Sequence, residues 1–90
     1  MKYYPRGTHP NSWHVVTPDD AVVYPTPIVA IIAPTNGNNH VFRAENIDGT
    51  IVDIPCVAVY RTVFHGAFRR LLSTGTTAAV TAAGVMVGFE

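Results

Sequence analysis

Most apolar runs in the chain end after a few residues, and prolines and turn-forming pairs such as Asn36-Gly37 and Asp48-Gly49 separate them. These prolines and turn residues interrupt the sequence too often for a long amphipathic helix to form. Turn signals recur every 8–12 residues or so, a spacing typical of antiparallel β proteins. The sequence therefore predicts an all-β fold: a small antiparallel β-sandwich or barrel of about six to seven strands with an extended N-terminal arm.

The N-terminal part of the chain is rich in proline, with five of the seven prolines among residues 1–27. Proline removes a backbone donor and pushes the preceding residue into an extended conformation, which excludes a helix here. We assign residues 1–20 to the extended arm, with one short strand at Trp13–Thr17, and residues 21–90 to the β domain.

The arm carries Tyr3, Tyr4 and Trp13, aromatic side chains that are unfavourable to leave in water. Three interpretations stay open. The arm folds back on its own domain, it reaches a neighbouring subunit, or it is disordered.

The β domain divides into short segments. The expected strands are Ala21–Tyr24, Ile28–Ala33, His40–Ala44, Thr50–Ile54, Val57–Phe64, Phe68–Leu72 and Val85–Phe89. The β-branched run Ile28–Ala33 suits a strand that is buried on both faces, and Val57–Phe64 is expected to be the longest strand. Asn36-Gly37 predicts a hairpin that pairs His40–Ala44 with Ile28–Ala33. Residues 76–83 are mostly small, which predicts a loop rather than an element of the core.

The composition indicates a protein that assembles with others. Charged residues make up 13% of the chain, about half of the typical share of roughly 25%. A chain of 90 residues buries only about 60–65% of its unfolded surface, and its single cysteine excludes an internal disulfide. We expect partners to supply the missing stability. The formal net charge is zero, so the chain lacks the excess of positive charge that attracts nucleic acid or an anionic membrane. We therefore expect neither as a partner.

The residues that could carry chemistry form no convincing set. The metal-ligand candidates are His9, His14, His40, His65 and Cys56, and no pair of them follows a metal-site spacing. A triad of Ser12, His14 and Asp19 would lie on the proline-broken arm without rigid support. We therefore expect no enzyme, no cofactor and no metal.

Eight residues are the candidates for contacts between subunits: Tyr3, Tyr4, Trp13, Tyr60, Arg61, Phe64, Arg69 and Arg70. The aromatic residues would bury apolar area, and the arginines would bind carboxylates on a partner. The alternative for the arginines is a solvated strand edge that discourages aggregation.

The ending of the chain resembles that of a known family. The stretch Leu72–Ala79 (LSTGTTAA) followed by the apolar strand Val85–Phe89 is similar to the ending of small virion proteins of tailed phages and gene transfer agents. These are head-spike base or capsid decoration subunits. The likeness spans residues 17–89, and its other parts are Thr17–Asp20, Val22–Ala33, Gly37–Ile54, Pro55 and Arg69–Ala78. Residues 79–84 are an insertion relative to the family pattern.

The resemblance implies a non-enzymatic, homo-oligomeric subunit, a trimer or a pentamer, on the capsid exterior. The implied partners are the major capsid protein and, as a further candidate, a head fibre protein. The single Cys56 fits synthesis in the reducing cytoplasm of the host. The alternative function is a carbohydrate- or receptor-binding β-module of a viral fibre or tip, in which Trp13, Tyr24 and Tyr60 stack on sugars.

Overall fold

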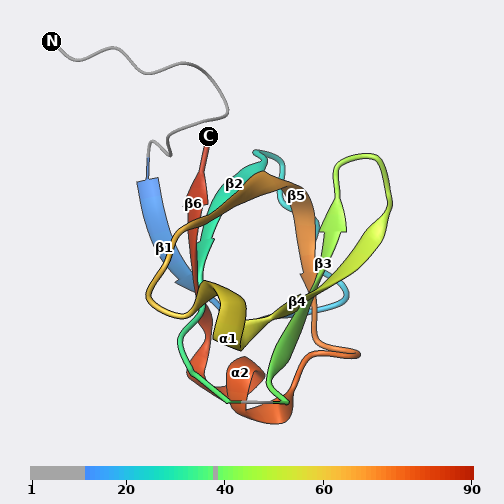
Figure 1. The fold of residues 1–90 in the computed structure, drawn as a ribbon. Helices are drawn as coiled ribbons and strands as arrows, with labels where there is room; N and C mark the ends of the chain where they lie inside the picture. The colour runs from blue at the N-terminus through green and yellow to red at the C-terminus, as the bar shows by residue number, and fades with distance from the viewer. Residues whose placement is uncertain (1–11, 38) are drawn as a thin grey trace, which may run out of the picture.

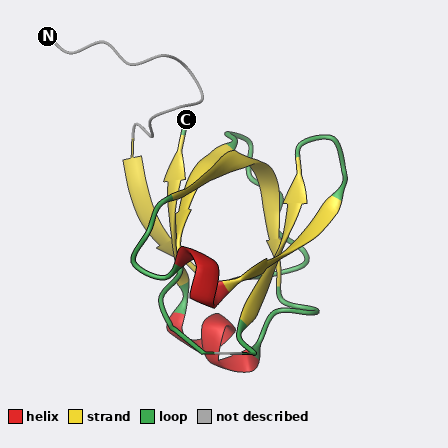
Figure 2. Ribbon diagram, viewed as in Figure 1, coloured by secondary structure: helices red, strands yellow, loops and turns green. Residues whose placement is uncertain are grey.

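The computed structural model describes residues 12–37 and 39–90, so Tyr3 and Tyr4 lie outside the described residues. It contains the strands β1 (Ser12–Val16), β2 (Ile28–Ile32), β3 (Val41–Asn46), β4 (Ile51–Pro55), β5 (Phe64–Leu72) and β6 (Val85–Phe89), and the helices α1 (Cys56–Val59) and α2 (Ala78–Ala83). All six strands form one antiparallel sheet in the order β1-β6-β2-β5-β3-β4 (Figure 1). The prediction of a small all-β fold is confirmed. The sheet is open, with β1 and β4 at its edges, and the two helices are short (Figure 2).

The longest strand, β5, joins two halves of the sheet. Its first residues pair with β2 and its last residues pair with β3, and Phe68 is opposite both Ile28 and Asn46. The register shifts on both sides of this point, between Ile28 and Ala30 in β2 and between Glu45 and Asn46 in β3. Such irregularities bend a strand and increase its twist. The sheet therefore curls, and β1-β6-β2 lies opposite β3-β4 (Figure 1).

The hydrophobic core fills the inside of this curl. Its members from the strands are Ile28, Ile31, Phe42, Ala44, Ile54, Phe68, Leu71, Val85 and Val87. In β6 the predicted alternation is confirmed, because Val85 and Val87 are buried whereas Met86 is exposed. The first four residues of β2 are all buried, as its β-branched run predicts.

The predicted hairpin at Asn36-Gly37 is wrong. The neighbours of β2 are β5 and β6, and β3 lies beyond β5. A strand that is apolar on both faces is most stable in the centre of a sheet, and later segments supply its two neighbours. The loop before β3 instead closes on itself. The amide of His40 donates to the carbonyl of Gly37 at 3.0 Å, and the hydroxyl of Thr35 lies 2.9 Å from Nδ1 of His40.

The predicted long strand Val57–Phe64 is also wrong. Residues 56–59 form helix α1, and β5 starts at Phe64. Cys56 and Val59 lie one helical turn apart and are both buried, whereas Val57 is exposed. Packing of this turn against the core therefore overrides the β propensity of its valines.

The expected strand Ala21–Tyr24 is a loop. It runs beside the second half of β5, where the amides of Asp19 and Tyr24 donate to the carbonyls of Leu71 and Arg69, each at 2.9 Å. Pro25 and Pro27 have no amide hydrogen and cannot extend a ladder.

The expected loop at residues 76–83 contains helix α2. Its alanines favour a helix, and Val80 is fully buried beneath the curled sheet. Gly84 ends α2 with φ of 80°, a conformation that favours glycine, and its amide donates to the carbonyl of Val80 at 3.0 Å. The small residues thus form a core element.

The buried position of Val80 leads to a test of α2. Val80→Ala should lower the free energy of unfolding by about 1.5–3 kcal/mol, because it removes buried methyl groups and leaves a cavity. The matched change Val57→Ala in α1 removes the same groups from an exposed side chain and should stay within about 0.5 kcal/mol. Chemical denaturation measures both. Equal losses for the two variants would contradict the placement of α2.

Candidate functional site

The first candidate surface lies on edge strand β1, which carries the predicted contact residue Trp13. Trp13 is 42% exposed and its neighbour Val15 is 64% exposed. In β6, Met86 is opposite Val15 and is 40% exposed. Trp13, Val15 and Met86 thus share the outer face of the sheet. We call these three residues the outer apolar strip.

The other face of β1 belongs to the core side of the sheet. Val16 packs against the hydrophobic core, and the ring of His14 lies 5.6 Å from the ring of Phe89. Strand β1 is therefore fixed on its inner face and exposes apolar side chains on its outer face.

Tyr60 and Arg61 lie at the turn between α1 and β5. The guanidinium of Arg61 lies 5.0 Å from the centre of the Tyr60 ring, within the range of a cation–π contact. Arg61 has φ of 59°, which is uncommon for a residue with a side chain. The two predicted contact residues are thus neighbours that bind each other at the surface.

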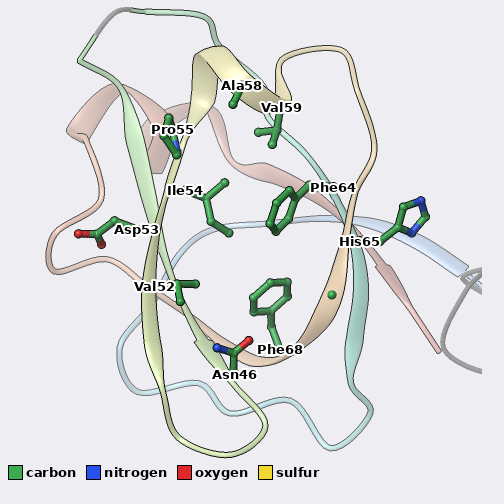
Figure 3. A pocket seen from close by; sticks show the side chains of 11 residues that line it. Asn46, Val52, Asp53, Ile54, Pro55, Ala58, Val59, Phe64, His65 and Phe68 are labelled. Atoms are coloured by element: carbon green, nitrogen blue, oxygen red, sulfur yellow. The ribbon is translucent and has the colours of Figure 1, made fainter.

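Phe64, another predicted contact residue, lines an apolar pocket of about 560 Å³. The side chains of Val52, Ile54, Val59, Phe64 and Phe68 point toward one another inside it (Figure 3). The rings of Phe64 and Phe68 stack with their centres 6.1 Å apart. Strand β4, helix α1 and the first half of β5 form the walls.

Three polar residues line this pocket, Asn46, Asp53 and His65, and Asn46 lies beside Phe68 (Figure 3). Asp53 and His65 point away from it (Figure 3). Asp53 is instead bound by Arg43, whose Nε donates to its carboxylate at 2.7 Å, and this bond lowers the pKa of Asp53. The pocket can therefore hold an apolar group, and it does not bring an acid, a base or a nucleophile together.

Arg69 and Arg70 both bind Glu45 of the same chain. The Glu45 side chain is 3% exposed, Nε of Arg70 donates to it at 3.0 Å, and Arg69 donates to its other oxygen. The hydrogen bond from Arg70 is the main reason that the pKa of Glu45 lies below its usual value. At these arginines β5 pairs with β3 on one side and accepts hydrogen bonds from the loop of residues 19–24 on the other, so they do not lie on a free strand edge.

The sequence motifs behind the family resemblance pack against each other. Asp20, from the TPDD stretch, accepts hydrogen bonds from the amides of Ser73 and Thr74 at 2.8 and 3.1 Å. The bonds from Thr74 lower the pKa of Asp20. The hydroxyls of Thr76 and Thr77 accept from backbone amides of β3, each at 2.9 Å. The STGTT turn is thereby tied to two parts of the fold.

The described parts of the chain hold no group of three His, Cys, Asp or Glu side chains that could bind a metal ion. Burial raises the pKa of the Cys56 thiol, which disfavours the reactive thiolate. Neither α1 nor α2 is long and apolar enough to cross a membrane.

Two features of these surfaces were not predicted from the sequence: the outer apolar strip beyond Trp13, and the ion pairs of Glu45. The exposure of Val15 and Met86 follows from reading β1 and β6 as paired strands, since their alternation already separates an inner from an outer face. The pairing of Glu45 with Arg69 and Arg70 has no local signal, because the partners lie 24 and 25 residues apart in sequence.

Comparisons of the chain with protein-family models, curated proteins and solved structures gave no match.

Glu45 provides a test of the arginine cluster. Its lowered pKa means that the ion pairs stabilise the fold above the usual carboxyl pKa of about 4.5, and that this stability is lost as the pH falls through the native pKa. Glu45→Gln should therefore lower the free energy of unfolding at about pH 7, and its stability should fall less steeply than that of the wild type toward about pH 3.

Asp53→Asn is the matched control, because Asp53 is 52% exposed and solvent screens its pair with Arg43. Denaturant titrations across the pH range measure both variants. An equal loss for both changes at neutral pH would contradict the special role of Glu45, as would an unchanged acid dependence in Glu45→Gln.

Proposed function

We propose that this chain is a non-enzymatic structural subunit of a phage virion. It sits on the capsid exterior as a head-spike base or decoration (cement) subunit, forms homo-oligomers and binds the major capsid protein. The observation that carries the proposal is the outer apolar strip on an edge strand, in a chain with only 13% charged residues. The location on a phage capsid is proposed from the order and spacing of the motifs that resemble the phage family.

Assembly accounts for the exposed apolar surface. Burial of apolar area contributes about 25 cal/mol per Å², so side chains such as Trp13 and Val15 gain stability when a partner covers them. A particle repeats each contact by symmetry, and repeated weak contacts hold a subunit far more strongly than one contact does. A chain whose small core is marginal benefits from both effects.

The arrangement of side chains supports binding by surface contact better than catalysis. The pocket beside Phe64 is apolar, and its neighbours Asp53 and His65 point outward. Ser12 and His14 lie on β1, and the side chains of His14 and Asp19 contact Phe89 and the amide of Ala21 rather than each other.

The alternative function, a carbohydrate- or receptor-binding module, has weaker support. It would use Trp13, Tyr24 and Tyr60 as stacking surfaces. Tyr24 is half-buried with its ring 5.3 Å from the ring of Phe89, Tyr60 holds Arg61, and none of the three lines the apolar pocket. Binding in a glycan screen would favour this alternative.

The assembly part of the proposal predicts the mass of the purified protein in solution. Sedimentation equilibrium at micromolar concentrations should give a mass that is a multiple of the 9.7 kDa chain and that falls on dilution. A folded monomer throughout this range would contradict assembly through the chain's own surfaces.

The virion part predicts where the protein is found. Gold-labelled antibodies against the chain should decorate the capsids of particles released from the producing cells, at positions that repeat with the capsid symmetry. Unlabelled capsids beside free protein would contradict the proposed location, whatever the mass in solution.

A further inference from the structure

We propose that two copies of this chain pair through their β1 strands, antiparallel and across a two-fold axis, and so join their sheets into one. The inference rests on the proposed function and deepens it, because it names the strand through which copies assemble. It gives a two-fold pair in place of the expected trimer or pentamer. The second copy adds its own β1 beside the first, a form of β-strand addition.

Strand β1 is open to such a neighbour. Within residues 12–37 and 39–90, β1 pairs with β6 on one side and with no strand on the other. Proteins protect free edges with charges, prolines or covering segments, and the β1 sequence Ser-Trp-His-Val-Val contains neither a charged residue nor a proline. An unprotected apolar edge is a template for pairing with another chain.

The opposite edge of the sheet is protected. Strand β4 carries Asp53 in an ion pair with Arg43 and ends at Pro55, which has no amide hydrogen to donate. The two edges therefore differ in the features that control pairing, and β1 is the one suited to a neighbour.

The identity of the neighbour follows from the sequence of β1 itself. The antiparallel register that pairs all five residues of β1 with a second β1 places His14 opposite His14 of the second copy. Trp13 then lies opposite Val15 of the second copy, and Val15 lies opposite Trp13 of the second copy. Pairs of an aromatic and a β-branched residue are favourable across strands, so the strand is complementary to itself.

The same register brings the two outer apolar strips together. Trp13 and Val15 point to the outer face of the sheet, and a two-fold axis perpendicular to the sheet keeps outer faces on the same side. Met86 extends the strip behind each β1. The formal net charge of zero gives no repulsion between copies. Pairing therefore joins two small apolar strips into one larger surface.

A pair of lysine substitutions tests this contact. Val15→Lys puts a charge on the free edge at a side chain that is 64% exposed, and Ile51→Lys makes a comparable change at a side chain that is 51% exposed on the β4 edge. Sedimentation should show that Val15→Lys weakens self-association by about tenfold or more, while Ile51→Lys leaves it unchanged. Circular dichroism confirms that both variants keep the fold.

Trp13 supplies a second readout, since it is the chain's single tryptophan. Its emission should move to shorter wavelength as the wild-type protein is concentrated, because the second copy covers the indole ring. The emission of Val15→Lys should not move over the same range.

Four results would overturn the inference. A loss of association in both variants indicates a head-to-tail contact between β1 and β4, and a loss in Ile51→Lys alone indicates pairing through β4. Association that neither variant weakens places the contact elsewhere, and this leaves the proposed assembly function intact. A wild-type protein that stays monomeric overturns the inference and the assembly part of the proposed function, and the labelling of capsids then tests the virion part separately.

Discussion

The buried carboxylate of Glu45 binds two arginines that are adjacent in sequence, Arg69 and Arg70. Adjacent residues of a regular strand point to opposite faces, but the pairing passes from Glu45–Arg70 to Asn46–Phe68 and leaves Arg69 as an extra residue of β5. This register shift between Glu45 and Asn46 lies where β5 passes from β2 to β3. The two ion pairs of Glu45 thus lie at the bend where the sheet curls, and the core fills the inside of that curl.

A curled open sheet has consequences for the surface. Its inner face is filled by the core and covered at one end by α2, so the strands that remain available are those at the edges. The β4 edge carries an ion pair and a proline, whereas the β1 edge carries Trp13 and Val15. The asymmetry between the edges gives the chain one preferred direction in which to extend its sheet. The open β1 edge thus connects the fold of this 90-residue chain, which has few charged residues, with its proposed assembly.

Local patterns predicted the local features well. The alternation in Val85–Phe89 and the continuous apolar run that begins at Ile28 gave strands with the expected burial, and Asp48-Gly49 gave the turn between β3 and β4. The errors concern distant partners. The neighbours of β2 come from later in the chain, and the valines after Pro55 form a helical turn because the core buries Cys56 and Val59. Among the candidate contact residues, Trp13 could be predicted from the sequence to lie at the surface. The partner of the two arginines was not, because no short-range pattern links them to Glu45.

Amide hydrogen exchange of β1 as a function of protein concentration tests the central claim most directly, because strand pairing protects the amides on the free edge. The account predicts that exchange in Ser12–Val16 slows as the protein is concentrated, while exchange in Ile51–Asp53 on the opposite edge stays the same. Exchange in β1 that does not change with concentration, in a protein that self-associates, would contradict pairing through this strand.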